Sequence, residues 1–409
     1  MKKTAVACLA LATLLVAAPA QATGRTGPQP VATSPACPPP ADVRPDPDAE
    51  IPPVNRAALE RAIAGLPAAD ATAAIVRVGG AKGSWQGVSG VADLAGKRKA
   101  SANARFRAGS VTKTFTTAVV LQLVAEGRVS LDGTVQEYLP GLLPETYPEV
   151  RVGQLLDHTS GLPAPDLPGS LEWVYRTRFR TWTPHEYVAL AVRNPIEFTP
   201  GTRQHYLNVN TFVAGLLIEQ ITGNSYEHEV TRRILRPVGM RDSHLPGASP
   251  RIRGPHHTGY QVVPEGFPDA VPYGSAHVVD MTEMSATLTW ASGDLITTAA
   301  DLEKFVRALF SGQIVPPAQL EPMFTVPGVT TYGTCEPAAY TSGMSRMVLP
   351  GGIVAYGKTG ARYGYAAGIG ATRDLSRTLV YSVNSTDAKA SGQNQRTLGI
   401  ALASFAEPS

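Results

Sequence analysis

The sequence has few cysteines, no cluster of basic residues and one long apolar run, which lies at its N-terminus. Three of its 409 residues are cysteines, so a framework of several disulfides is excluded. The formal net charge is +3, and no run of lysine and arginine interleaved with aromatics is present, which argues against nucleic acid as a partner. With 43% hydrophobic and 17% charged residues, the composition is that of a globular protein able to bury a large core.

The apolar run at the N-terminus predicts a secretory signal peptide. Lys2 and Lys3 precede a run that ends at Ala18, and a small-x-small cleavage site follows at residues 20–22. The run is short for a membrane span. We therefore expect residues 1–22 to be removed, which leaves a secreted, extracellular protein without a membrane span.

The rest of the chain divides by composition. Residues 23–53 are rich in proline, which predicts an extended, poorly ordered leader. Residues 54–405 then form one domain, in which helix and strand patterns at 54–109 and 295–405 flank a mostly helical part at 110–294. This order predicts an α/β fold of the α+β type, with an antiparallel sheet built from both ends of the chain, flanked by N- and C-terminal helices and carrying an inserted helical domain.

Apolar spacing and turn residues give the expected elements of this domain. We expect helices at 54–66, 110–126, 210–220, 298–310 and 395–405, and strands at 73–78, 85–91, 353–356, 363–372 and 378–384. The first two strands are expected to form a hairpin. No internal repeat is present.

The first motif that carries chemistry is Gly109-Ser110-Val111-Thr112-Lys113, at an expected helix start. Helix positions i and i+3 share a face, so the Lys113 amine can reach the Ser110 hydroxyl. A serine hydroxyl needs a base to become a nucleophile, and lysine can be that base when burial or a nearby cation lowers its pKa. The motif alone also fits an exposed serine followed by a solvated lysine.

Two further motifs follow in a defined order: Tyr-x-Asn at 206–208 and Lys-Thr-Gly at 358–360. Ser-x-x-Lys and Lys-Thr-Gly belong to the penicillin-recognising serine hydrolases. The sequence resembles the class C β-lactamase and DD-peptidase family, and most closely the secreted soluble D-alanyl-D-alanine carboxypeptidases. The resemblance covers roughly residues 54–405 and implies a β-lactamase/transpeptidase-like fold. Supporting matches lie at 106–110, 155–162, 200–206 and 290–302.

The resemblance implies a catalytic role for the residues of the first two motifs. Ser110 would be the acylated nucleophile, and Lys113 would be its base. Tyr206 would pass a proton to the leaving group. Asn208 would orient Lys113 and the substrate amide.

The third motif is implied to bind substrate. Lys358 and Thr359 would contact its carboxylate, with Gly360 on the same strand, and the backbone N–H groups of Ser110 and Ala361 would form the oxyanion hole. Two positions depart from the soluble carboxypeptidases, which often carry histidine in place of Lys358 and can carry threonine in place of Ala361. Both departures leave the substrate open.

Two more residues are candidates for substrate binding. Arg346 precedes the strand expected at 353–356, where the soluble carboxypeptidases carry a carboxylate-binding arginine, and a guanidinium can grip a carboxylate with two hydrogen bonds. An ordinary surface arginine is the alternative. Trp290 is expected either in the core or in the substrate cleft.

The histidines and the remaining cysteines suggest no other chemistry. His158 follows an aspartate, but no Gly-x-Ser-x-Gly elbow accompanies it, so we expect a structural residue at a helix end and not a triad member. His256 and His257 lack further ligands, so neither a metal nor a cofactor is expected. Cys37 and Cys335, the cysteines left after signal removal, either pair or stay free.

These observations predict a serine hydrolase that works through an acyl-enzyme. The favoured activity is a D-alanyl-D-alanine carboxypeptidase that acts on peptidoglycan-type peptides and is acylated by penicillin. A class C-type β-lactamase, an esterase and a D-aminopeptidase of the same fold remain open. A penicillin-binding sensor without turnover is the alternative of another class. The expected partners are a small peptide or β-lactam substrate, with no nucleic acid, and the protein is expected to be a monomer.

Overall fold

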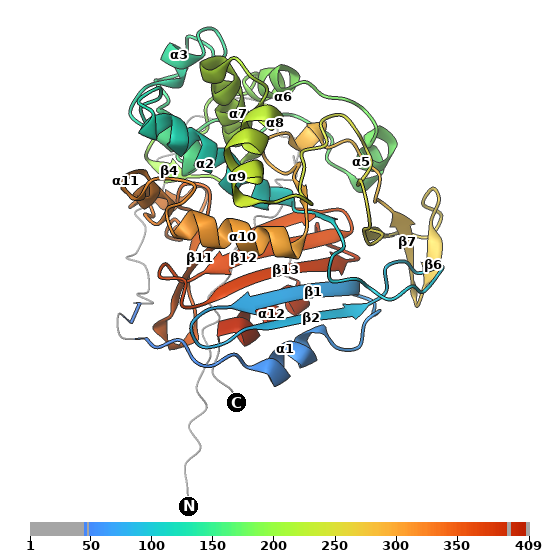
Figure 1. Ribbon diagram of the computed structural model, residues 1–409. Helices are drawn as coiled ribbons and strands as arrows, with labels where there is room; N and C mark the ends of the chain where they lie inside the picture. Colours follow the sequence, from blue (N-terminus) through green and yellow to red (C-terminus); the bar gives the residue numbers. More distant parts are fainter. Residues whose placement is uncertain (1–44, 47–48, 391–393, 406–409) are drawn as a thin grey trace, which may run out of the picture.

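The computed structural model describes residues 45–46, 49–390 and 394–405. Its centre is a six-stranded antiparallel sheet with the order β10-β11-β12-β13-β1-β2. β13 pairs with both β1 and β12, so the two ends of the chain build one sheet (Figure 1), which confirms the expected fold class. The strands are β1 (Ala71–Gly79), β2 (Trp85–Gly90), β10 (Ser345–Val348), β11 (Val354–Arg362), β12 (Tyr365–Ala371) and β13 (Thr378–Ser385).

Helices cover both faces of this sheet. Figure 1 shows α1 (Arg56–Ile63) and α12 (Gln395–Phe405) below the sheet and α2 (Thr112–Ala125) and α10 (Ala299–Phe310) above it. Leu379 of β13 packs in the lower core and its neighbour Val380 in the upper core. Because both faces are covered, β12 and β13 are buried along their whole length, and their sequences lack the alternation of a half-exposed strand.

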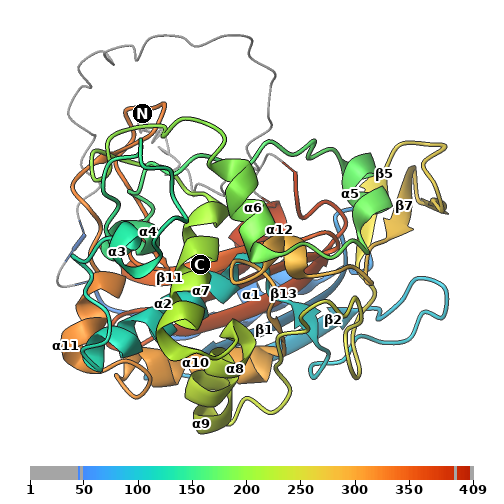
Figure 2. The same ribbon diagram turned by 90° about the horizontal axis from the view of Figure 1, so that it is seen from above.

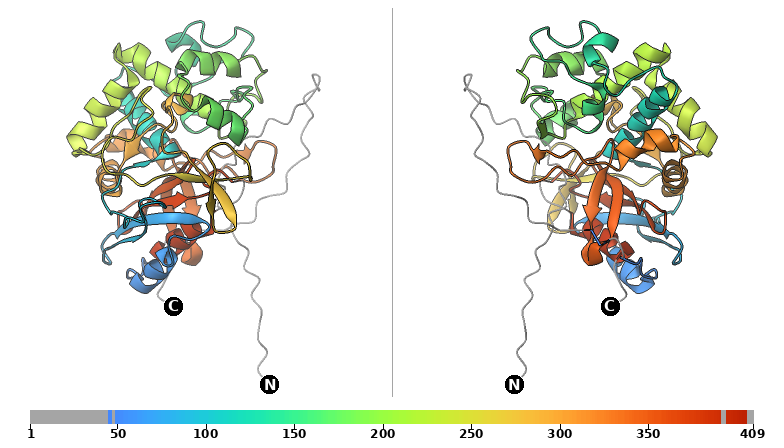
Figure 3. Two further views of the ribbon diagram at one scale, coloured as in Figure 1. Left: turned by 90° about the vertical axis from the view of Figure 1, so that its right-hand side faces the viewer. Right: turned by 90° about the vertical axis from the view of Figure 1, so that its left-hand side faces the viewer.

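The helical part forms a second layer over the sheet (Figures 2 and 3). α2 lies between the sheet and α7 (Asn208–Thr222), and its first ten residues are buried on all sides. Polar and apolar side chains alike are buried in these ten residues, because no side of this part of the helix faces water. The other helices are α3 (Val135–Tyr138), α4 (Val152–Leu156), α5 (Leu171–Thr177), α6 (Pro184–Ala191), α8 (Tyr226–Val230), α9 (Arg236–Val238) and α11 (Pro317–Leu320).

Three small sheets were not expected from the sequence. The strands β5 (Tyr260–Val263), β6 (Val271–Tyr273) and β7 (Ala276–Asp280) form one within the helical part, beside α5. β3 (Phe106–Arg107) pairs with β8 (Ile296–Thr297) where the chain enters and leaves the helical part. β4 (Arg203–Gln204) pairs with β9 (Thr330–Thr331). Strands this short carry too few residues for a period of two to be visible.

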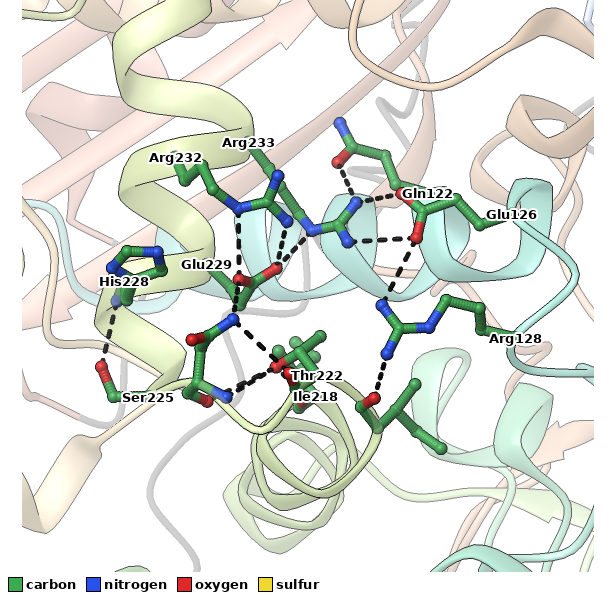
Figure 4. Close-up of polar contacts among 12 residues, drawn as sticks. Gln122, Glu126, Arg128, Ile218, Thr222, Ser225, His228, Glu229, Arg232 and Arg233 are labelled. Atoms are coloured by element: carbon green, nitrogen blue, oxygen red, sulfur yellow. Dashed lines mark hydrogen bonds and ion pairs between the residues drawn. The ribbon is translucent and has the colours of Figure 1, made fainter.

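A buried ionic cluster joins α8 and the π-helical turn at Thr231–Leu235 to α2 (Figure 4). The carboxylate of Glu229 is fully buried and accepts hydrogen bonds from Arg232 and Arg233. Arg233 also donates to Glu126, just after the end of α2. Burial raises the pKa of Glu229, but the two arginines outweigh this effect and hold that pKa at about 2. The carboxylate is therefore charged and paired at neutral pH.

Part of the expected leader is ordered against the domain. Ile51 is buried, and the Pro52 carbonyl accepts a hydrogen bond from the fully buried Arg377. The disorder expected up to residue 53 is therefore wrong for these last residues, because they have buried partners. Cys335 is disulfide-bonded, whereas the expected signal peptide and Cys37 lie outside the described residues.

Within the described ranges, none of the helices combines the length and the apolar character that crossing a bilayer requires.

Candidate active site

A cavity of about 330 Å³ opens beside Ser110 and is lined by residues of the sheet, of the helical part and of α12. Its lining brings together the three sequence motifs, with Ser110, Tyr206 and Lys358 among the residues that face it. These residues come from the start of α2, the segment before α7, and β11. The fold thus places segments that are far apart in the chain around one hollow.

Ser110 lies in a 3₁₀ turn that leads directly into α2. Gly109 has a φ of 53°, and a Cβ at this position would lie 2.6 Å from the backbone nitrogen of Ala361. A Cβ on Gly360 would lie 2.8 Å from the backbone nitrogen of Ser110. Glycine at both positions lets the two backbones approach. The amide nitrogens of Ser110 and Ala361 are therefore neighbours, as two donors of an oxyanion hole must be.

Lys113 lies one turn along, with its ammonium group beneath the serine. Its Nζ is 3.2 Å from Ser110 Oγ and donates to Asn208 Oδ1 at 2.8 Å and to the Ser292 carbonyl at 2.9 Å. The side chain is fully buried. Burial, followed by the charge of Lys358, lowers the pKa of Lys113 well below its usual value. A lowered pKa favours the neutral amine, which is the form of lysine that can act as a base.

Tyr206 lies beside the nucleophile with its phenol buried. Its ring stacks on Tyr340 with centroids 4.7 Å apart and contacts His158 at 4.6 Å. Burial and the neighbouring Tyr340 raise the pKa of Tyr206, and the nearby Ser110 hydroxyl opposes them only in part. Its hydroxyl has no hydrogen-bond partner among the described residues. The phenol is therefore a neutral donor free to reach a substrate atom.

Asn208 is the first residue of α7, so the end of that helix fixes its position. The helix begins two residues earlier than expected. Its amide oxygen accepts a hydrogen bond from Lys113, and Asn208 is among the residues that line the cavity. Asn208 also lies beside the buried hydroxyl of Tyr187. It can orient both the lysine and a substrate carbonyl.

β11 offers a free edge to the cavity. β10 pairs with β11 only along Val354–Gly357, so among the described residues no strand covers that side of the segment from Lys358 to Arg362. Thr359 is exposed within this segment and lines the cavity. An extended peptide can add to such an edge through backbone hydrogen bonds.

Lys358 brings a buried cation to this edge. Its side chain is 5% exposed, and Nζ donates to the Thr359 carbonyl at 3.0 Å. It also lies over the rings of Tyr206 and Tyr340, 4.6 and 5.7 Å from their centroids. Burial lowers the pKa of Lys358 to about 7. An anion bound here would stabilise the charged form of Lys358, which burial disfavours.

Two residues expected to bind substrate do not line the cavity. Trp290 is buried, packs against Phe212 and Tyr226, and donates its indole N–H to Glu227 at 2.9 Å. Of the two positions that the sequence left open for Trp290, the structure shows the one in the core. Arg346 lies on β10 opposite Tyr356, where it is half-buried. The residue of β10 that does face the cavity is its neighbour, Met347.

The histidines take structural positions. His158 follows α4 in a left-handed conformation, with a φ of 65°, and its ring supports Tyr206. His256 contacts the Gly254 carbonyl, and His257 accepts from the Ser101 N–H at 2.9 Å. In the described part of the chain, no three histidine, cysteine or acidic side chains gather in a way that could hold a metal ion.

Several cavity residues were missed from the sequence. Arg362 and Lys389 add two cations to the lining, and Tyr187 and Tyr340 add two aromatic side chains. Arg362 directly follows the third motif, so its position on the strand could have pointed to it. Lys389 lies in the loop between β13 and α12, and nothing in the local sequence indicates that this loop folds back to the cavity.

A serine paired with a buried lysine, a nearby tyrosine and two converging backbone amides is an arrangement that can activate a hydroxyl as a nucleophile and stabilise an oxyanion. The family model described as Beta-lactamase matches residues 59–403. The chain belongs to this family, which confirms the expected resemblance. Its penicillin-binding homologues share the fold.

Individual relatives differ in their described activities. The Esterase EstB of Burkholderia gladioli is 29% identical over 48% of this chain and 55% of that protein. Penicillin-binding protein 4 of Amycolatopsis lactamdurans is 29% identical over 52% of each chain. The chain thus spans about half the length of the curated relatives it matches.

A solved structure extends the similarity over most of the domain. The D-stereospecific amidohydrolase from Streptomyces sp. has a TM-score of 0.73 and 29% sequence identity, covering 85% of this chain and 98% of that one. The relatives therefore share a fold and differ in the substrates that their names describe.

Proposed function

We propose that this protein is a carboxypeptidase-type serine hydrolase, which releases a C-terminal D-residue from peptides such as those ending in D-Ala-D-Ala and is acylated by penicillin. The observation that carries the proposal is the buried Lys358 cation at the free edge of β11, beside the exposed Thr359 and close to Ser110. A substrate carboxylate next to the scissile amide is the anion that this arrangement would pair.

Acylation follows from the contacts of the three motifs. The neutral amine of Lys113 takes the proton of Ser110 Oγ, which lies 3.2 Å away, as the oxygen attacks the substrate carbonyl carbon. The oxyanion that forms is stabilised by the N–H groups of Ser110 and Ala361. The scissile C–N bond then breaks, and the leaving nitrogen takes a proton from the Tyr206 hydroxyl, which Lys113 reprotonates.

Deacylation repeats the same steps with water. The water molecule loses a proton to the Tyr206–Lys113 pair and attacks the ester carbonyl of the acyl-enzyme. Ser110 leaves with a proton and the acid product is released. Water would enter through the cavity that held the leaving group.

A second candidate is a hydrolase of D-aminoacyl amides or peptides with a free amino terminus. The similarity to the D-stereospecific amidohydrolase favours it. Among the described residues that line the cavity, one carboxylate, that of Asp387, could pair with a substrate ammonium. Against it, three cations line the same cavity: Lys358, Arg362 and Lys389.

One substrate panel separates these activities. A peptide ending in D-Ala-D-Ala, the same peptide with a C-terminal amide, D-phenylalanine amide, nitrocefin and a p-nitrophenyl ester would be assayed side by side. The proposal expects the free carboxylate peptide to have the highest kcat/KM and its amide to lose at least tenfold. Preference for D-phenylalanine amide would support the second candidate, and preference for nitrocefin or the ester would indicate a β-lactamase or an esterase. Stable penicillin labelling without turnover of any substrate would indicate a sensor.

We also propose that the protein acts outside the cell as a monomer. The expected signal peptide supports export, and extracellular peptides are then its accessible substrates. Cell fractionation with N-terminal sequencing tests the first point, and light scattering on the purified mature protein tests the second.

A further inference from the structure

Two cations in the cavity take no part in the mechanism above. Arg362 is the last residue of β11 and is 8% exposed. Lys389 lies in the loop between β13 and α12 and is half-buried. Both side chains line the same cavity as Ser110.

Neither cation has a charged hydrogen-bond partner in the described part of the chain. The Arg362 guanidinium donates to the Met284 sulfur at 2.9 Å, which is a weak acceptor. The Asp294 carboxyl acts on Arg362 only through space, and burial raises the pKa of Asp294 to about 8, so it is largely neutral at pH 7. Lys389 makes no ion pair with any residue that the structure describes. Burial, followed by the charge of Arg362, lowers the pKa of Lys389 to about 8.

The acidic side chains in the cavity do not offset these charges. Asp387 is the one acid among the described residues that line it. It is exposed, and it is not among the groups whose charge acts on Arg362 or Lys389. Two neighbouring cations held without a counterion are unfavourable in the empty site. An anionic ligand would remove both the unpaired charge and the repulsion between Arg362 and Lys389.

The position of these two cations separates them from Lys358. Lys358 and Arg362 are four residues apart on one strand, which corresponds to about 13 Å at the rise of an extended chain. Between them, Gly360 packs against the backbone of Ser110. The nucleophile therefore lies between two cationic regions. If the leaving group lies over Lys358, the acyl part of the substrate lies toward Arg362.

We infer that Arg362 and Lys389 form an anion subsite for the acyl side of the substrate, so that the substrates are acyl donors carrying a carboxylate of their own on this side of the scissile bond. The direction of the substrate along β11 rests on the proposed function. The subsite itself rests on the two unpaired cations in the cavity.

A pair of substrates that differ in one charge tests this inference. Succinyl-D-alanine thiobenzyl ester carries a carboxylate on the acyl side, and methoxysuccinyl-D-alanine thiobenzyl ester is the same molecule with that charge masked. We expect the wild-type protein to prefer the succinyl compound by about tenfold or more in kcat/KM, the effect of one charged hydrogen bond. Lys389→Met should remove most of this preference, and Lys389→Arg should retain it.

Controls separate the subsite from general damage. Lys82→Met removes an exposed lysine outside the cavity and should leave the preference unchanged. Arg362→Lys keeps a charge where a smaller side chain could disturb folding, and it should lower the preference without a loss for the masked ester. Equal kcat/KM for the two esters in the wild-type protein, or equal losses for both in Lys389→Met, would overturn the inference.

The same comparison can be made without turnover. Calorimetry with Ser110→Ala should show that succinyl-D-alanine amide binds more tightly than methoxysuccinyl-D-alanine amide, in which the succinyl carboxylate is masked. Equal binding of the two amides would contradict the subsite. Neither pair of compounds ends in a free D-alanine carboxylate. The test of the subsite is therefore independent of the proposed carboxypeptidase activity. The preference for a charged acyl group can be present when D-Ala-D-Ala peptides are not cleaved, and it can be absent when they are.

Discussion

Lys113 Nζ lies 3.2 Å from Ser110 Oγ and is also fixed by Asn208 and by the carbonyl of Ser292. Two acceptors from other parts of the chain thus hold the amine against the hydroxyl, so its position does not depend on the flexibility of a lysine side chain. Such fixing of a base is what places a reacting group at a productive distance before the substrate arrives.

The first prediction concerns the acylated residue. Benzylpenicillin should form one adduct per molecule, on Ser110, because this hydroxyl is the one next to Lys113 and to the paired backbone amides. Intact-mass spectrometry with peptide mapping measures it. Ser110→Ala should abolish the adduct. The matched control, Ser292→Ala, keeps it, since Lys113 contacts the carbonyl of Ser292 and not its hydroxyl. An adduct that survives Ser110→Ala would refute the assignment.

The second prediction concerns the base. Lys113→Met should retain the fold and reduce the rate of acylation by about a thousandfold or more, since removing a member of such a catalytic unit removes most of the activation. Stopped-flow acylation and a thermal melt measure the two effects. In the wild-type protein, kcat/KM for a neutral ester should rise as pH passes through the lowered pKa of Lys113, far below 10.5. An activity that starts only near the pKa of an ordinary lysine would contradict this role.

The third prediction is a pH dependence specific to carboxylate substrates. With its pKa lowered to about 7, Lys358 is charged below that pH and neutral above it in the free protein. The ratio of kcat/KM for a peptide with a free carboxylate to that for a neutral ester should therefore fall as pH rises through about 7. Taking the ratio cancels the effect of Lys113, which both substrates require.

Two variants check this pH dependence. Lys358→Met should give a low ratio that no longer changes with pH. Arg346→Ala should change it by less than about twofold, because Arg346 is not among the residues that line the cavity. A large loss in Arg346→Ala, confined to the carboxylate substrate, would restore the role that the sequence offered for this arginine.

The fourth prediction concerns stability. Glu229→Gln leaves Arg232 and Arg233 without their shared carboxylate, while Arg233 keeps Glu126. It should lower the free energy of unfolding by about 1.5–3 kcal/mol, the effect of a hydrogen bond to a charged group. The folded pKa of Glu229 is about 2 and its ordinary value is 4.5. Its stabilising effect is therefore fully present above pH 4.5 and is lost as pH falls from 4.5 to 2.

Urea denaturation at pH 7 and at lower pH measures the effect of Glu229. The matched control is Glu172→Gln, which removes an exposed pair with Arg176 and should cost less than about 0.5 kcal/mol. If the two variants have the same stability, the buried cluster does not contribute as described.

The sequence predicted the antiparallel sheet because its long strands are apolar runs bounded by turn residues, and it predicted the terminal helices from their helical period. It did not predict β3, β8, the edge strand β10 or the small sheet around β7, since two to five residues are too few to show a period. The strand expected at 353–356 continues as β11 to Arg362 and includes the third motif. The start of α2 was placed at Ser110, whereas the helix proper begins at Thr112 after a 3₁₀ turn. That turn depends on the approach of β11, which is a tertiary contact.

The residues of the candidate site could likewise be predicted only in part. The motif residues could be named in advance because each motif is a short stretch of fixed chemistry. Lys389 could not, because its place in the cavity depends on how the loop after β13 crosses the end of the sheet. The sequence left Trp290 either in the core or in the cleft. In the structure its indole ring packs against Gly215 of α7, where a Cβ would lie 2.7 Å from the ring, and this close contact places Trp290 in the core.

The strand order also sets when the protein can first become active. β13 lies between β1 and β12 in the sheet, so the N-terminal hairpin of β1 and β2 has no place to dock until nearly the whole chain has been made. Such distant pairings make folding slow, because a long loop must close before they form. A chain cut short before β13 would lose the bridge between its two ends, and Ser110 would be left without the ordered β11 that completes its oxyanion hole. Catalytic competence should therefore arise late and all at once, as a property of the finished chain.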